Sequence, residues 1–183
     1  MFEVRAPPYN NSLFTISSNR VLGMIRKITQ QDFHFIYELY MHPDVNKYLL
    51  YEPMSEEEFN SVFADFLEKE IIYIFEIAGQ PAGMFKLVPY SHRTSHVAYV
   101  GGLAIHPSHS GKGLGSQMMN EIKELAKEKE MRRIELSTSV INERAIRLYE
   151  KAGFQKEGIL RKYSYLETED RYLDEVMMAW INE

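Results

Sequence analysis

The chain has 183 residues, 45% of them hydrophobic and 13% aromatic, with a formal net charge of −5 and no cysteine. This length suits one globular domain with a sizeable core, and the acidic balance without a lysine- or arginine-rich block argues against a nucleic-acid partner. The lack of cysteine excludes disulfides and a thiol nucleophile, and because there is neither an apolar stretch of membrane length nor a secretory leader, we expect no membrane partner and a cytoplasmic location.

The chain begins with a segment that we expect to precede the folded domain. Residues 1–20 contain Pro7 and Pro8 together with several Asn and Ser residues, a composition typical of an irregular arm. Regular apolar patterns begin near residue 21. We therefore predict an N-terminal arm over 1–20 and a single domain over 21–183.

Apolar periodicity and capping residues predict an alternation of strands and helices. Thr29 with Asp32 and Ser55 with Glu58 match the start signals of two helices. In chain order the predicted elements are a strand over 21–28, helices over 29–41 and 55–70, a hairpin of strands over 71–78 and 81–88, a strand over 96–105, a helix after the turn at 110–116, a strand over 133–140, a helix over 142–152, and strands over 154–181 with a turn near 167–170.

A glycine-rich turn joins the strand over 96–105 to the next helix. It reads Ser110-Gly111-Lys112-Gly113-Leu114-Gly115-Ser116. Such a turn presents free N–H groups and the positive end of a helix dipole, where phosphate oxygens bind readily, and glycine lets the backbone approach them. The spacing fits neither a Walker loop nor a dinucleotide fingerprint. A tight connection without a ligand is therefore the plain alternative.

Residues 142–154 are the most informative segment of the chain. They read Asn-Glu-Arg-Ala-Ile-Arg-Leu-Tyr-Glu-Lys-Ala-Gly-Phe, which predicts an amphipathic helix capped by Asn142 and ended by a left-handed glycine. Asn142 and Tyr149 lie on one side of this helix, about 10 Å apart at about 1.5 Å per residue. That span suits a short thioester arm. A simple core stripe along the same face would give the same pattern.

Together these two segments resemble the GNAT family of N-acetyltransferases. The family's cofactor motif, Arg/Gln-x-x-Gly-x-Gly/Ala, is matched by Gly113 and Gly115, but Ser110 stands where Arg or Gln is usual. The later motif, Asn-x-x-Ala-x-x-Leu-Tyr-x-x-x-Gly-Phe, is matched at every fixed position from Asn142 to Phe154. The resemblance covers roughly residues 21–181. It implies an α/β (α+β) fold with a mixed, mostly antiparallel central sheet, flanking helices and a splayed, bulged central strand.

The resemblance also implies where acetyl-CoA binds. The cofactor-binding residues on the turn would be Gly111, Lys112, Gly113, Leu114, Gly115 and Ser116. Gly101 and Gly102 would mark the bulge that splays their strand, although a plain relief of twist is the alternative. Leu103 and Ile105 would then pair with the pantetheine arm through their backbone groups, and Asn142 would bond the arm or an ordered water. No metal is expected.

The implied reaction moves acetyl from acetyl-CoA to a primary amine by direct attack in a ternary complex. The N–H of Leu103 is the candidate donor to the oxyanion, and Tyr149 is the candidate acid for the leaving CoA thiolate. The missing cysteine fits direct attack. Deprotonation at pH 7 costs about 1.4 kcal/mol for an α-amine and roughly 4.6 kcal/mol for a lysine-like amine, so a modest base suffices for the first class.

No general base stands out in the sequence. Glu135 and His96 are weak candidates for which a structural role is the alternative, and Tyr99 could line the acceptor pocket or lie in the core. His106 and His109 flank a turn without further ligands at suitable spacing. We interpret them as solvated loop residues and not as a metal site.

The acceptor is predicted only as a small-molecule amine. Residues 92–98, with 157–163 and 172–174, resemble a subgroup whose members acetylate free amino acids, polyamines or ribosomal protein N-termini. Arg93 could bind a substrate carboxylate or simply face solvent. We rank a free amino acid or another small amine first, and a polyamine or a protein N-terminus second. A homodimer, a non-catalytic acetyl-CoA-binding module and a nucleotide-phosphate enzyme remain open alternatives.

Overall fold

The computed structural model describes residues 23–49 and 51–183, so the expected arm over 1–20 lies outside the described residues. Within these described residues, seven strands form one sheet in the order β1-β2-β3-β4-β5-β7-β6. The strands are β1 (Gly23–Lys27), β2 (Ile72–Ile77), β3 (Gln80–Pro89), β4 (Val97–Ile105), β5 (Arg133–Ser139), β6 (Gln155–Leu166) and β7 (Arg171–Ile181). The helices are α1 (Phe33–Met41), α2 (Pro43–Asn46), α3 (Glu56–Lys69), α4 (Leu114–Glu128) and α5 (Glu143–Lys151).

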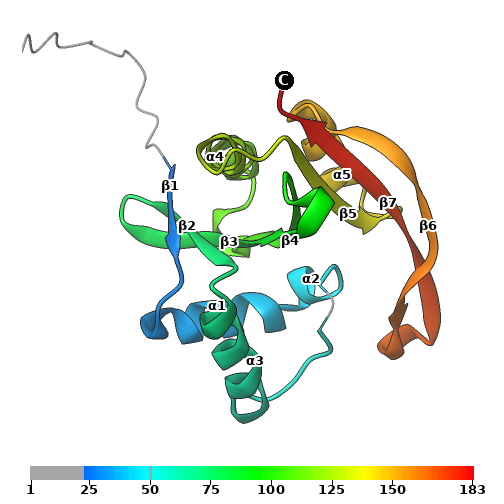
Figure 1. Ribbon diagram of the computed structural model, residues 1–183. Coiled ribbons are helices and arrows are strands. Elements are labelled where there is room, and N and C mark those ends of the chain that lie inside the picture. Colours follow the sequence, from blue (N-terminus) through cyan, green and yellow to red (C-terminus); the bar gives the residue numbers. More distant parts are fainter. Residues whose placement is uncertain (1–22, 50) are drawn as a thin grey trace, which may run out of the picture.

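The predicted fold class and the predicted order of elements are confirmed (Figure 1). The capping box of Ser55 and Glu58 starts α3 as predicted. The box of Thr29 and Asp32 starts a short 3-10 turn that runs into α1. The sequence reading missed α2, whose one turn is too short to show a periodicity; it begins at Pro43 and is capped by the His42 side chain.

The sheet diverges at its centre. All neighbouring strands are antiparallel except β4 and β5, which run parallel and pair only from Val97 to Tyr99. Beyond that point β4 also carries a bulge, because Lys86 pairs with Gly101 whereas Met84 pairs with Ala104. The expected bulge and splay are therefore present, and they leave a gap between β4 and β5.

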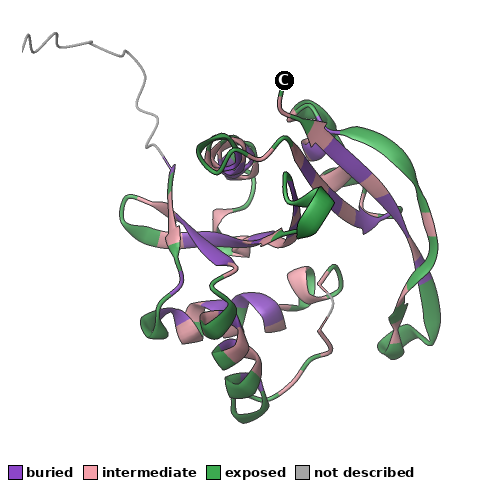
Figure 2. Ribbon diagram, in the orientation of Figure 1, coloured by how far each residue is buried: buried purple, intermediate pink, exposed green. Residues whose placement is uncertain are grey.

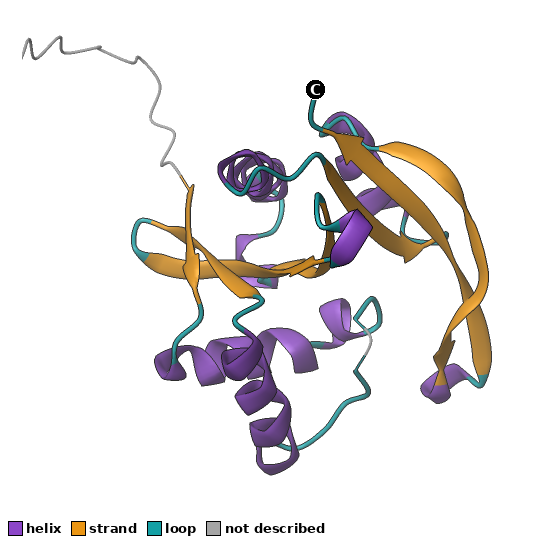
Figure 3. Ribbon diagram, viewed as in Figure 1, coloured by secondary structure: helices purple, strands orange, loops and turns teal. Residues whose placement is uncertain are grey.

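Helices cover both faces of the sheet (Figures 1 and 3). One face packs on α4 and α5, in a core cluster that includes Met118, Ile122, Leu136, Phe154 and Met178. The other face packs on α1 and α3, in a cluster that includes Ile36, Phe59, Phe66, Ile74 and Met84. Figure 2 shows these buried residues concentrated in the sheet and on the inner sides of the helices. The two clusters hold the strands on each side of the central gap.

Strands β6 and β7 form a long hairpin that reaches beyond the helices (Figure 3). The predicted turn near 167–170 is a short 3-10 turn at its tip. The pairing of β6 with β7 shifts register between Leu160 and Ser164, and within this bulge the N–H of Lys162 donates to Asp174 Oδ1 at 2.7 Å. In the described ranges, no helix is long and apolar enough to cross a membrane.

Candidate active site

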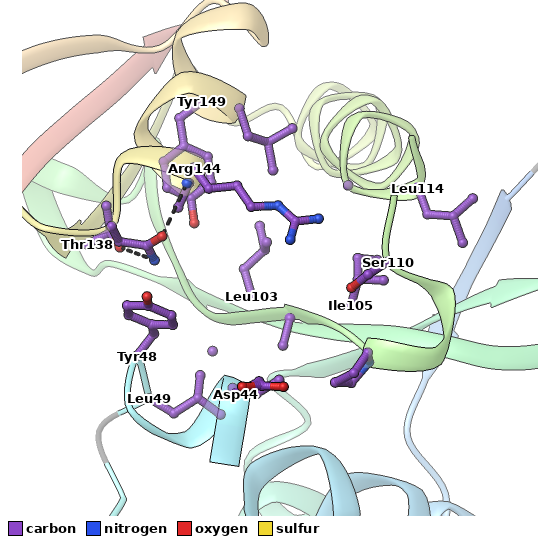
Figure 4. A pocket seen from close by; sticks show the side chains of 18 of the residues that line it. Asp44, Tyr48, Leu49, Leu103, Ile105, Ser110, Leu114, Thr138, Arg144 and Tyr149 are labelled. Carbon is purple, nitrogen blue, oxygen red and sulfur yellow. Dashed lines mark hydrogen bonds between the residues drawn. The ribbon is translucent and has the colours of Figure 1, made fainter. Parts of the chain in front are cut away.

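A cavity of about 580 Å³ lies where β4 and β5 diverge. We call it the larger cavity; β4, the turn before α4, the end of β5, α5 and the α2 region form its walls (Figure 4). The predicted site residues that line it are Leu103, Ile105, Gly111, Gly113, Leu114, Gly115, Ser116, Asn142 and Tyr149. Lys112 does not line it, and its Nζ donates instead to the Ser108 carbonyl at 3.3 Å.

The turn before α4 exposes backbone N–H groups to the larger cavity. Gly111 and Gly113 have φ angles of +78° and +75°, which side-chain-bearing residues rarely adopt. Gly113 is the N-cap of α4 and supplies no side-chain cap to its first turn. A Cβ at either glycine would meet no atom within 4 Å. The open, uncapped helix end therefore forms a cradle suited to phosphate oxygens.

Gly115 has a different physical reason for being glycine. A Cβ at this position would lie 3.1 Å from Leu148 Cδ2 on α5. Glycine therefore allows α5 to pack closely against α4, in addition to any contact with a ligand.

Strand β4 offers backbone groups along its open edge. The N–H of His106 donates to the Ala82 carbonyl of β3 at 2.9 Å. Because successive residues of a strand direct their N–H and C=O groups to opposite edges, those of Leu103 and Ile105 face the gap. A ligand with amide groups could pair there in the manner of an added strand.

Helix α5 is capped as predicted. The N–H of Ala145 donates to Asn142 Oδ1 at 3.3 Å, and Asn142 Nδ2 donates to Thr138 Oγ1 at 3.2 Å. Gly153 follows the helix with a φ of +91°. These bonds fix the Asn142 amide at the cavity wall and still leave one N–H and one lone pair for a ligand.

Tyr149 lines the larger cavity while packing in the core of α4 and α5. Its side chain is buried, and burial raises the pKa of its hydroxyl well above the ordinary value. The hydroxyl therefore holds its proton at neutral pH. Figure 4 shows it directed into the cavity from α5, on the wall opposite β4 and Leu103, with Arg144 extending over the cavity beside it.

A second cavity of about 260 Å³ adjoins the first, and we call it the smaller cavity. The two share Lys47, Tyr48 and Leu49 as lining residues. The inner wall of the smaller cavity carries Glu175 of β7, which is buried. Ser137, which lines the larger cavity, donates its hydroxyl to Glu175 Oε2. This hydrogen bond connects the two cavities.

Four residues considered for the acceptor side line neither cavity. Glu135 is held by Arg133 Nε at 2.6 Å and by the Tyr90 hydroxyl at 3.2 Å. The Tyr99 hydroxyl shares a 2.8 Å hydrogen bond with Ser137, and burial raises its pKa. His96 and Arg93 are exposed.

The structure adds site residues that the sequence reading did not single out. They are Tyr48, Ser137, Thr138, Arg144 and Glu175. The sequence signal for one of them was present, because Glu175 is a carboxylate directly before a run of apolar residues in β7. No local sequence pattern indicated the other residues.

The expectation that both histidines near the turn are solvated is wrong for His106, because its side chain packs against the α1 region, is only 17% exposed and lies 3.4 Å from Glu38 through Nε2. His106 Nδ1 lies 2.7 Å from Ser108 Oγ, and its ring centroid is 6.4 Å from that of His109. In the part of the chain that the structure describes, no group of three or more His, Cys, Asp or Glu is arranged to hold a metal ion.

Comparison with known proteins agrees with this geometry. Residues 33–154 match the model of the Acetyltransferase (GNAT) family. A candidate ribosomal protein bS18-alanine N-acetyltransferase of Bacillus subtilis (strain 168) is 37% identical over 86 residues, which span 47% of this chain and only 55% of that protein. A spermidine N(1)-acetyltransferase of Vibrio cholerae is 26% identical over 144 residues, 74% of this chain and 80% of that protein. The crystal structure of spermidine N-acetyltransferase from Vibrio cholerae in complex with CoA and spermine superposes with a TM-score of 0.77 at 25% identity, covering 88% of this chain and 96% of that one.

Proposed function

Since the chain belongs to the Acetyltransferase (GNAT) family, we propose that it transfers the acetyl group of acetyl-CoA to a small primary amine by direct attack in a ternary complex. The first candidate acceptor is a free amino acid or another small amine. The observation that carries this proposal is the larger cavity, in which the cradle before α4, the open edge of β4 and the Tyr149 hydroxyl face one space.

The residues present fit acetyl-CoA. The N–H groups at Gly113 and Ser116 would bind the pyrophosphate at the N-terminus of α4; in support, a Cβ at Gly113 would meet no atom within 4 Å, so the space beside it is open. The backbone of Leu103 and Ile105 would pair with the amide-bearing arm. Arg144, which extends over the cavity, adds a cation that Ser110 does not supply.

The side chains around the gap suit the chemistry of acyl transfer. Acetyl-CoA supplies an acetyl group that is activated as a thioester. The N–H of Leu103 would donate to the acetyl oxygen as negative charge develops on it. Tyr149, whose hydroxyl is kept protonated at neutral pH by burial, would give its proton to the departing thiolate, and the proton that the attacking amine loses would restore the hydroxyl through solvent water. Asn142 would orient the arm between them.

The acceptor amine would enter through the smaller cavity. That cavity adjoins the larger one at Tyr48 and Leu49, so an amine within it is directed toward the gap between β4 and β5. The sequence contains no cysteine, and so no cysteine acyl-enzyme precedes the attack. Holding both substrates in adjoining cavities supplies the proximity that a direct transfer needs.

A polyamine is the second candidate acceptor. The spermidine N(1)-acetyltransferase of Vibrio cholerae aligns with 74% of this chain, and its counterpart in the solved complex holds spermine. The formal net charge of −5 also favours a cationic substrate. A protein N-terminus, as in the Bacillus subtilis relative, is the third.

A panel of amines assayed by release of the CoA thiol tests the proposal. The panel includes free amino acids, monoamines, polyamines and a peptide with a free N-terminal alanine. We expect acetyl transfer to at least one small amine. If the protein binds acetyl-CoA in a calorimetric titration but acetylates no member of the panel, the chain is a non-catalytic acetyl-CoA-binding module and the proposal fails.

A further inference from the structure

The smaller cavity contains a buried carboxylate without a cationic partner. Glu175 is 7% exposed, and it accepts hydrogen bonds from Ser137 and, at 3.4 Å, from Ser164. In the described part of the chain, Glu175 takes part in no ion pair. Burying a carboxylate away from any positive charge is costly. A cationic ligand would therefore compensate Glu175.

A second buried polar group of the same cavity, the Ser139 hydroxyl, could also receive a ligand. Ser139 of β5 lies directly opposite Glu175 of β7 in the sheet, so both side chains are on one face. Ser139 is 7% exposed, lines the cavity, and its hydroxyl makes no hydrogen bond within the described residues. A hydroxyl oxygen accepts readily from an ammonium group. The pair therefore offers a carboxylate and a hydroxyl to one cation.

The rim of the smaller cavity suits the same kind of ligand. Tyr48, Tyr163 and Tyr165 line it and are partly exposed, and aromatic faces attract ammonium groups. Glu52 contributes a second carboxylate, and Lys47 contributes one ammonium, which lies 5.1 Å from the Tyr48 ring centroid. Because Lys47 is exposed whereas Glu175 is buried, the inner end of the cavity is anionic.

We propose that the smaller cavity binds a second ammonium group of the acceptor at Glu175 and Ser139. This narrows the proposed small amines to diamines and places polyamines ahead of free amino acids. This inference rests on the acetyl-transfer function proposed above. With one ammonium held at Glu175, the other end of the molecule extends past Ser137 into the larger cavity. An amine without a second charge leaves Glu175 uncompensated and binds more weakly.

The test compares diaminobutane with butylamine, which has the same carbon chain and one amine fewer. We expect the wild-type protein to prefer diaminobutane by about tenfold or more in kcat/KM. Glu175→Gln keeps the shape and removes the charge, and it should lower kcat/KM for diaminobutane by about tenfold to a hundredfold, chiefly through KM. The value for butylamine should change by less than about threefold.

Glu121→Gln is the matched control. This carboxylate on α4 is partly buried but lines neither cavity. Its substitution should change neither substrate's kcat/KM. If Glu175→Gln does not fold, Ser139→Ala and Glu52→Gln replace it, with a smaller loss for diaminobutane alone. An equal loss for both amines in Glu175→Gln overturns the proposal, since Glu175 would then act on the reaction or the fold.

Calorimetric titration of diaminobutane without acetyl-CoA separates this inference from the proposed function. If diaminobutane binds more weakly to Glu175→Gln than to the wild-type protein, and neither acetylates any amine, the cation site is supported and the proposed acetyl-transfer activity is wrong. Acetyl transfer with equal use of both amines keeps the enzyme and overturns the cation site.

Discussion

The larger and the smaller cavity are built from different parts of the polypeptide. Side chains such as Asn142, Arg144 and Tyr149 line the larger cavity, but the groups proposed for the pyrophosphate and the amide-bearing arm are backbone: two glycines with positive φ, an uncapped helix end and the open edge of a bulged strand. The polar groups of the smaller cavity come from side chains, among them a buried carboxylate, two serine hydroxyls and three tyrosines. Backbone groups are present whatever the residue type, whereas a side chain can be exchanged by one substitution. We therefore expect the first cavity to keep its ligand across many sequences and the second to set the choice of acceptor.

The largest expected effect falls on the one side chain of the larger cavity that has a chemical role. Tyr149→Phe keeps the packing of the ring and removes the hydroxyl, so we expect kcat to fall by about a hundredfold or more while the Kd for acetyl-CoA changes little. The matched control is Tyr73→Phe, since Tyr73 is buried in the same core cluster but lines neither cavity. An unchanged kcat in Tyr149→Phe would show that Tyr149 is not the proton donor.

A smaller effect is expected from the backbone of the cradle. Gly113→Ala forces a side chain into a φ of +75°, and Gly79→Ala does the same at +74° in the turn between β2 and β3; neither Cβ meets an atom within 4 Å. Both variants should lose about 1–2 kcal/mol in the free energy of unfolding. Only Gly113→Ala should also weaken acetyl-CoA binding, by about tenfold, as measured by titration. Equal affinities in the two variants would contradict a backbone cradle at this turn.

A still smaller effect is expected where a side chain is added to the cradle. Ser110 lines the larger cavity at the position where the family motif has Arg or Gln. Ser110→Arg should tighten acetyl-CoA binding by only about two- to fivefold, because an exposed charge pair contributes little. A gain of more than about a hundredfold would mean that backbone alone is a poor anion site here.

The smallest expected effect concerns stability. Glu175→Gln retains acceptors for the hydroxyls of Ser137 and Ser164 while removing a buried charge. We expect the free energy of unfolding, measured in urea, to change by less than about 1 kcal/mol or to increase. A loss of about 3 kcal/mol or more would show that the carboxylate supports the fold, and the contrast between the two cavities would then weaken.

The fold was predictable where its signals are local. Capping boxes, the glycines that end helices and the alternation of apolar residues operate over a few neighbouring positions, and each predicted helix and strand is present. The bulge was predictable because two glycines in one strand disfavour regular pairing there. Helix α2 could not be predicted, because a single helical turn that begins at Pro43 shows no apolar periodicity.

The two cavities also differ in how far local sequence patterns predict their residues. The residues of the larger cavity lie in short contiguous motifs, such as 110–116 and 142–149, so reading the sequence brought most of them together. The smaller cavity combines positions near 48, 139, 164 and 175, which meet only through the pairing of β5 with β7 and the bulge of β6. No local pattern encodes that register. Arg93, for which the sequence left a substrate carboxylate and solvent as alternatives, is exposed and lines neither cavity, in agreement with the second alternative.

A crystal structure of the protein with CoA and diaminobutane would examine both cavities at once. We expect the pyrophosphate at the N–H groups between Gly111 and Ser116, the thiol beside Tyr149, and one ammonium of the diamine within hydrogen-bonding distance of Glu175. A CoA molecule bound away from this turn, or a diamine that leaves Glu175 without a partner, would contradict this expectation.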